Sequence, residues 1–248
     1  MHPADLSPTV IALVVLAFML GGMVKGTLGI GLPLVVVPLL SLQVGPALAI
    51  VWVAVPVLAS NVWQFKDSPE PLSQVRRFMP MLVASAITTA ITVPMTLALS
   101  ARALNVMLAG ALLLAIFLLA VNPRLNISER HEKWASAAVG GFSGILGGIS
   151  SLTGPIIVTY LMALRLPREV FVGTISAIYL CTSSILYLAM ALVGRFRWVD
   201  LAVSALTMLP VFAGLALGKR LRQHLSEVLF RRLLLAFLSL IALVLLFK

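Results

Sequence analysis

The chain has 248 residues, with 18 lysines and arginines against 8 aspartates and glutamates, and a formal net charge of +10. Hydrophobic residues make up 61% of the sequence and charged residues 10%, and the mean hydropathy is +1.11. A soluble domain carries about 25% charged residues, so this chain has too few charges to cover a water-facing surface. The composition excludes a soluble globular protein and predicts an all-α, polytopic membrane protein.

Charge and cysteine content exclude further classes. The basic residues form short clusters between apolar runs, as in loops that hold a membrane topology, so we expect no nucleic-acid partner. A single cysteine, Cys181, excludes a disulfide framework and a cysteine-based metal site. The amino-terminal residues MHPADLSP lack a basic n-region, so the first apolar stretch is expected to be a retained span rather than a cleaved signal.

Apolar segments follow one another at 9–24, 28–42, 45–65, 78–99, 103–121, 135–149, 154–165, 170–193, 199–217 and 229–247. Crossing a membrane takes about 20 apolar residues, so we expect spans at 45–65, 78–99, 103–121, 170–193 and 199–217. The last segment also spans if Arg231 and Arg232 snorkel to the interface. The other four segments are short and form two adjacent pairs, each broken by glycine, proline and hydroxyl residues. Each pair could be two tilted spans or a re-entrant hairpin.

Lysines and arginines predict the orientation. With two tilted spans or a re-entrant hairpin in each pair, one side holds 14 of these residues and the other holds Arg102, Arg195, Arg197 and Lys248. If each pair is instead one broken span, the counts are 8 and 9, with Lys25 set aside. Because positive loops stay inside, we expect the first arrangement, with both termini outside.

The two halves of the sequence resemble each other. Gly22-Met-Val-Lys-Gly26-Thr-Leu-Gly29 aligns with Gly140-Gly-Phe-Ser-Gly144-Ile-Leu-Gly147, and after a four-residue insertion Pro33 aligns with Pro155. The orientation makes the two copies inverted, which together with interrupted segments indicates a secondary transporter with a midplane site between the repeats. We expect a first repeat at 1–121, a cytoplasmic linker at 122–134 and a second repeat at 135–248. These glycines also suit close helix packing, and that alternative stays open.

The two breaks also carry a family resemblance. GGMVKGTLGIGLPLVVVPLL and GGFSGILGGISSLTGPIIVTYLMALRLPREVFVGT resemble the two copies of the TauE/SafE motif. The resemblance covers essentially the whole chain and implies a bacterial transporter of sulfite, organosulfonates or other sulfur-containing anions. Such a transporter lies in the inner membrane, so the expected outside termini would be periplasmic. The GxGG often found in that family is Gly29-Ile-Gly31-Leu32 in the first copy and Ser150-Ser-Leu-Thr-Gly154 in the second. The resemblance indicates the class more closely than the substrate.

Lys25 is the first candidate for binding an anion. It lies in an apolar break, where a cation costs roughly 2.5–3.5 kcal/mol unless it is compensated. Lys25 is either a counter-charge for the substrate, assisted by helix N-termini, or a residue that snorkels to the interface.

Polar uncharged residues complete the expected substrate site. The hydroxyls of Thr27, Ser143, Ser150, Ser151 and Thr153 either donate hydrogen bonds to substrate oxygens or satisfy backbone groups freed at the breaks. Asn61, with Gln64 one turn below it, either binds the substrate or joins helices by a hydrogen bond. The full expected set is Lys25, Thr27, Gly29, Asn61, Gln64, Ser143, Ser150, Ser151, Thr153 and Gly154, whereas the tyrosines are expected to pack.

Other functions are less well supported. Gly141-Phe-Ser143-Gly144 matches the GxSG of intramembrane serine proteases, but the three histidines fall in the tail or in loops, where none can act as its base. All carboxylates fall in loops or at segment ends, so no buried proton relay is expected. We therefore expect no catalytic residue, no metal and no cofactor. The expected partners are a small anion and the lipid bilayer, and further copies of this chain are a candidate partner. A passive anion channel is the nearest alternative to a transporter.

Overall fold

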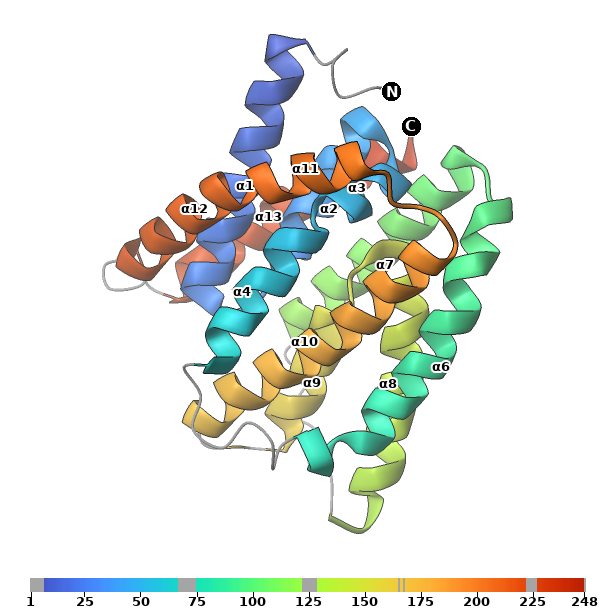
Figure 1. Ribbon diagram of the computed structural model, residues 1–248. Coiled ribbons are helices and arrows are strands. Elements are labelled where there is room, and N and C mark those ends of the chain that lie inside the picture. The colour runs from blue at the N-terminus through green and yellow to red at the C-terminus, as the bar shows by residue number, and fades with distance from the viewer. Residues whose placement is uncertain are drawn as a thin grey trace. The chain divides into compact units, whose positions relative to one another are not determined.

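The computed structural model describes residues 7–66, 75–121, 129–164, 166, 168–221 and 227–247, and these are helical apart from short connections (Figure 1). The all-α prediction is therefore confirmed. The helices are α1 (Pro8–Leu28), α2 (Leu32–Val44), α3 (Pro46–Trp52), α4 (Ala54–Lys66), α6 (Met79–Met95), the 3-10 turn η2 (Thr96–Ala98), α7 (Ala101–Val121), α8 (Glu129–Ser150), α9 (Gly154–Ala163), α10 (Arg168–Leu192), α11 (Trp198–Leu206), α12 (Met208–Leu221) and α13 (Glu227–Leu246).

Helix starts follow from local sequence. The Ser7 hydroxyl accepts a hydrogen bond from the backbone N–H of Val10 at 3.4 Å and caps α1, which begins at Pro8. Proline also occupies the first or second position of α2, α3, α6 and α9, where its missing N–H has no intrahelical partner to lose. The prolines that break the apolar segments thus begin new helices.

Five helical stretches are long and apolar enough to cross a membrane: Pro8–Leu28, Met79–Ala98, Ala101–Val121, Gly173–Leu192 and Trp198–Leu221. The pair α3 and α4, bent by 41°, would make a sixth. The prediction that the segment 9–24 is short was wrong, because α1 continues through Gly22 and Gly26 to 21 residues. Likewise α8 has 22 residues and begins at Glu129, inside the predicted linker 122–134, of which residues 122–128 lie outside the described residues. The second members of the pairs are short, with 13 residues in α2 and 10 in α9.

The chain forms two compact units, and each combines segments from both halves of the sequence. Unit 1 consists of Met1–Val57, Ser100–Ile116 and Arg195–Lys248, and unit 2 of Leu58–Leu99 and Phe117–Gly194. The division into repeats at 1–121 and 135–248 stays a prediction.

Unit 1 is built around a close contact between α1 and α12. A β-carbon on Gly22 would overlap the carbonyl oxygen of Val211, and one on Gly26 would overlap that of Leu215. In return, a β-carbon on Gly218 would overlap the carbonyl oxygen of Met23. Residue numbers rise together along both helices, so the helices are parallel. These glycines therefore serve close packing.

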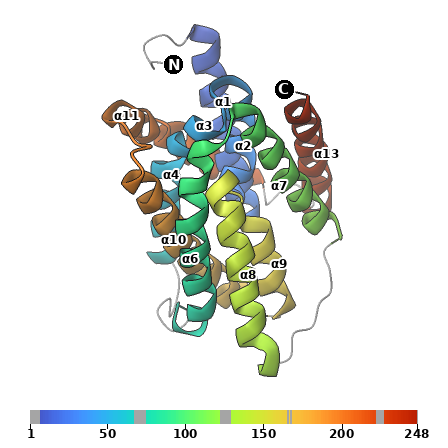
Figure 2. The same ribbon diagram turned by 90° about the vertical axis from the view of Figure 1, so that its right-hand side faces the viewer.

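Unit 2 repeats this contact between α6 and α8, which lie side by side in both views (Figures 1 and 2). A β-carbon on Gly140 would overlap the carbonyl oxygen of Met81, and one on Gly144 would lie 2.5 Å from that of Ser85. The Thr89 hydroxyl donates a hydrogen bond to the Gly144 carbonyl at 3.2 Å. The two helices are again parallel, as α1 and α12 are.

Both short helices fold back on the helix before them. A β-carbon on Gly21 of α1 would meet Val36 of α2, and one on Gly31 would lie 3.1 Å from Val24, so α1 and α2 are antiparallel. In unit 2, Gly147 lies beside Thr153 whereas Tyr160 further along α9 reaches back to Glu132 near the start of α8. These antiparallel hairpins exclude the arrangement in which each pair continues in one direction as a single broken span.

Candidate functional site

The two helix breaks, Gly29–Gly31 and Ser151–Thr153, both begin with a residue of positive φ. Gly29 has φ 81° and ends α1, and its N–H donates a hydrogen bond to the Lys25 carbonyl at 2.7 Å. Ser151 stands at the matching place after α8 with φ 60°, in the left-handed region that favours glycine. A serine in this conformation reverses the chain where the first repeat uses glycine.

Each break leads into an uncapped helix N-terminus. In α2 the first intrahelical bond runs from the Val35 N–H to the Gly31 carbonyl at 3.3 Å, and in α9 from the Ile157 N–H to the Thr153 carbonyl at 3.4 Å. Neither Gly31 nor Thr153 supplies a side-chain cap. The N–H groups of a first helical turn have no partner within the helix and carry a partial positive charge. Such an N-terminus is suited to binding an anion.

Lys25 lies in the last turn of α1, directly before the first break, and is only 3% exposed. A side chain that snorkels to water keeps its charged end exposed, and this burial speaks against that alternative. A cation at a helix C-terminus is favoured by the helix dipole. Lys25 is therefore a basic side chain held inside the protein at the end of α1.

Three of the predicted hydroxyl residues form hydrogen bonds with helix backbone. Thr27 donates to the carbonyls of Met23 at 2.9 Å and Gly218 at 3.2 Å, which joins α1 to α12. Ser143 donates to the Gly140 carbonyl at 3.0 Å. Ser150 donates to the Leu146 carbonyl at 2.7 Å and accepts from the Leu152 N–H at 3.3 Å. In these contacts the three hydroxyls donate to backbone carbonyl groups, and that of Thr27 also joins two helices.

Ser151, Thr153 and Gly154 lie together at the second break. The methyl group of Thr153 faces Gly147, where a β-carbon would lie 2.6 Å away. Gly154 is the first residue of α9. These three residues stay the best hydroxyl and backbone candidates for the site.

Asn61 and Gln64 lie on α4, where Asn61 is 1% exposed and Gln64 is half-buried. Both belong to unit 2 and both form polar interactions in the folded chain. The burial of Asn61 fits either of its two predicted roles.

Two tyrosines of α10 approach the second break, although the sequence predicts that they pack. A β-carbon on Gly154 would lie 2.7 Å from the Tyr179 hydroxyl oxygen. The Tyr187 side chain interacts with that of Ser151. The spacing of eight residues places both tyrosines toward one side of α10, which is the signal in the sequence that could have identified them.

A second cluster, which the sequence did not indicate, satisfies backbone groups at the bend between α3 and α4. Pro56 has no N–H to give to the Trp52 carbonyl one turn earlier, and the Ser204 hydroxyl of α11 donates to that carbonyl at 2.7 Å instead. The same hydroxyl accepts from the Val55 N–H at 3.0 Å. Nearby, Asp200 accepts from the Trp52 indole at 3.4 Å and from Arg197 at 3.0 Å. The sequence places Asp200 at a segment end, and it is buried there, 2% exposed.

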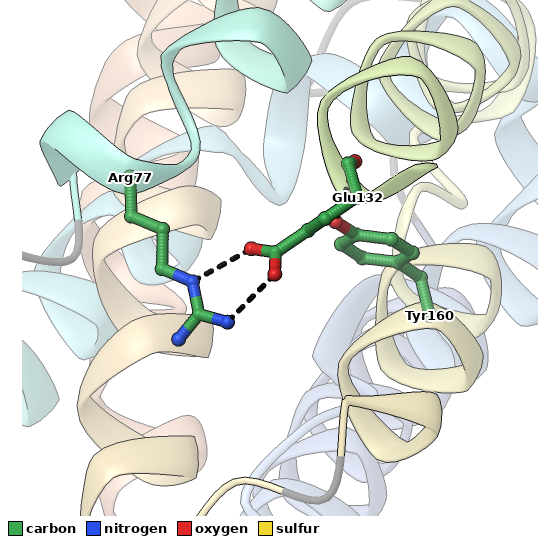
Figure 3. A network of polar contacts seen from close by, with 3 residues as sticks. All are labelled: Arg77, Glu132 and Tyr160. Carbon is green, nitrogen blue, oxygen red and sulfur yellow. Dashed lines mark hydrogen bonds and ion pairs between the residues drawn. The ribbon is translucent and has the colours of Figure 1, made fainter. Parts of the chain in front are cut away.

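Unit 2 is tied at one end by an ion pair, drawn in Figure 3. The Arg77 guanidinium donates to both carboxylate oxygens of Glu132 at 2.7 and 2.9 Å. The Tyr160 hydroxyl donates to the Glu132 carbonyl at 3.3 Å, and its ring meets Phe78 edge-on with 6.1 Å between centroids. This network joins the start of α8 to α9 and to the residues just before α6, and it has the character of a structural clamp.

Among the described residues no group of three or more histidine, cysteine, aspartate or glutamate side chains could hold a metal. The Ser143 hydroxyl of the GxSG sequence is fully buried and donates to a backbone carbonyl. The hydrogen bond of this serine hydroxyl is thus directed to helix backbone rather than to a catalytic base.

The apolar helices and the two helical hairpins define a multi-pass helical membrane protein. The family model described as Sulfite exporter TauE/SafE matches residues 14–245. The chain belongs to this family, whose members are membrane transporters and not enzymes, and the predicted family is confirmed. Comparisons with curated proteins and with solved structures find no match.

Proposed function

We propose that this chain is a secondary transporter that exports a small sulfur-containing anion such as sulfite or an organosulfonate from the bacterial cytoplasm. The observation that carries the proposal is the burial of Lys25, 3% exposed, directly before the break that opens the uncapped N-terminus of α2. A buried ammonium group and a helix N-terminus both favour negative charge. The family, sulfite exporters, supplies the substrate class.

The duplicated architecture supports alternating access. Gly22 and Gly140 occupy matching positions of the two repeats, and each packs against backbone of a parallel helix from the other half of the sequence. We propose that the two repeats are inverted and that their relative movement exposes the bound anion to each side in turn, as in other transporters with inverted repeats.

The membrane potential can supply the driving force. An inside-negative potential favours the exit of an anion by about 2.3 kcal/mol per charge per 100 mV. Export as a uniporter therefore requires no buried carboxylate for proton coupling. Backbone carbonyls at the breaks could still coordinate a coupling ion.

Flux into proteoliposomes tests this proposal. Purified protein is reconstituted and offered sulfite, thiosulfate, an organosulfonate, sulfate and a carboxylate, with and without an imposed potential. We expect saturable, potential-sensitive flux and counter-exchange for at least one sulfur oxyanion. Flux that never saturates and shows no exchange would indicate a channel, and no flux of any sulfur anion would reject the proposed substrate class.

A further inference from the structure

The Tyr179 hydroxyl is buried, and among the residues that the structure describes it has no hydrogen-bond partner. Buried polar groups are nearly always hydrogen-bonded, and each exception requires an explanation. Tyr160, by contrast, donates to the Glu132 carbonyl. An unused donor on α10 is therefore a feature that packing alone does not explain.

The position of this hydroxyl is specific. It lies against Gly154, the first residue of α9, where a β-carbon would stand 2.7 Å from the hydroxyl oxygen and 3.6 Å from the ring carbon that carries it. Only glycine allows the phenol to approach the start of the helix this closely. Tyr179 and α9 both belong to unit 2, and α10 packs on α9.

The first turn of α9 presents donors at the same place. Its first intrahelical bond starts at the Ile157 N–H, so the N–H groups of Gly154 and Ile156 come before the bonded part of the helix. Thr153 gives these groups no side-chain cap, and Pro155 has no N–H. Backbone donors, the positive end of the helix dipole and a phenol donor therefore converge on one edge of the break.

We propose that the Tyr179 hydroxyl and the first turn of α9 bind an oxyanion, with the phenol donating a hydrogen bond to one anion oxygen. Several neutral donors meet at this place, and an oxyanion offers each of them a separate acceptor oxygen. A halide offers a single acceptor atom, and each buried donor left unmatched is costly. The identification of this oxyanion as the transported sulfur anion rests on the proposed function. Tyr179 is thus a specificity-determining residue of the second break.

Thermal unfolding of the purified full chain tests the site without transport. Wild type, Tyr179→Phe and the matched control Tyr160→Phe are heated with sulfite, thiosulfate or sulfate, and with chloride at equal ionic strength. We expect oxyanions to raise the melting temperature of the wild type and of Tyr160→Phe. In Tyr179→Phe the apparent Kd should rise about tenfold or more, as expected for the loss of a hydrogen bond to a charged group.

Stability without anion provides a second readout. Tyr179→Phe removes a buried hydroxyl that lacks a partner, so its melting temperature without anion should equal or exceed that of the wild type. Gly154→Ala should also weaken oxyanion binding, because its β-carbon displaces the hydroxyl. A role in packing alone would leave the oxyanion shift of all variants unchanged.

Flux of the same variants separates the two proposals. Oxyanion binding that depends on Tyr179, without transport of any sulfur anion, would support the site and reject the proposed function. Transport and oxyanion stabilisation that persist unchanged in Tyr179→Phe would reject the site and leave the function standing. A wild type that no oxyanion stabilises, or that chloride stabilises equally, would also overturn the site.

Discussion

Single residues at the two breaks combine structural and binding roles. Thr27, Ser143 and Ser150 donate to backbone carbonyls, as expected where helix breaks leave polar groups in an apolar protein. Lys25 and Tyr179 are different, because Lys25 is a buried basic residue in the last turn before a break and Tyr179 brings a buried donor to the start of α9. The hydroxyls thus hold the breaks in shape, and these two side chains are the better candidates for contact with an anion.

Substitution of Lys25 tests the charged part of the site. Lys25→Ala removes a charge-assisted contact worth about 1.5–3 kcal/mol, so the half-saturation concentration for transport should rise roughly 10–150-fold. Lys25→Arg should lose less because it keeps the charge, although its planar guanidinium differs in shape from an ammonium group. The measurement is a concentration series of proteoliposome flux at matched protein levels.

Lys66→Ala is the matched control, since it removes the same charge from an exposed position at the end of α4. We expect its half-saturation concentration to stay within about twofold of the wild type. Unchanged half-saturation in Lys25→Ala, Lys25→Gln and Lys25→Arg would remove Lys25 from the binding site.

At the scale of helices, glycine decides which elements can touch. In an apolar membrane, helix association depends on close packing rather than on the hydrophobic effect. Gly22, Gly26, Gly140 and Gly144 each let another helix approach until backbone meets backbone. The four-residue insertion before Pro155 corresponds to about one helical turn. It extends α8 beyond the glycines that align with α1, and Gly148 in the added turn still lies against Thr92 of α6.

Gly26→Ala tests this packing. Its β-carbon would overlap the Leu215 carbonyl oxygen, so α1 and α12 must separate, and overpacking of this kind costs about 1–3 kcal/mol. The control is Gly110→Ala on α7, where nothing lies within 4 Å of the new β-carbon and alanine gains about 0.5–1 kcal/mol of helix stability. Thermal unfolding in detergent should show a lower melting temperature for Gly26→Ala only. An equal response of the two variants would contradict the packing role.

For the whole molecule, the antiparallel hairpins decide how loops are counted. α2 returns along α1, and α9 returns along α8. The chain is therefore expected to leave each pair on the side from which it entered, whether the pair re-enters or crosses twice. The hairpins therefore favour the predicted count of 14 positive residues against 4, and the orientation itself stays a prediction. Arg124, Arg165, Arg222 and Lys248 lie outside the described residues, and their contribution rests on sequence position.

Cysteine labelling tests the orientation. In a Cys181→Ser background, a cysteine in the loop 122–133 should react only with reagents that enter the cytoplasm, because that loop belongs to the positive side. Ser100→Cys, exposed before α7, should react with impermeant reagents from outside, as should a tag after Lys248. A cytoplasmic Lys248 together with an external segment 122–133 would overturn the orientation, whereas labelling of both from the same side would contradict the inversion of the repeats.

The amino-acid sequence by itself determined the membrane class, the family and some of the places where new helices begin. These properties depend on composition and on neighbours in the chain. Runs of apolar residues form spans, and Pro33 and Pro155 each lie in the first turn of a new helix. The inversion of the repeats and the ten predicted site residues stay predictions. Lys25 could be singled out because a lone cation in an apolar run is conspicuous without any knowledge of its neighbours.

Tertiary structure decided what depends on residues far apart in the sequence. The sequence left open whether Gly22 and Gly140 break or pack, because the answer lies in helices about 190 and 60 positions away that bring carbonyl oxygens against them. Pro56 has no N–H to donate to the Trp52 carbonyl, and the hydroxyl that donates to it instead belongs to Ser204, far away in the sequence. Tyr179 looks like an ordinary packing residue until Gly154 is found beside its hydroxyl. Hydrogen bonds and steric overlaps act over a few ångströms, so only the folded chain reveals which residues share them.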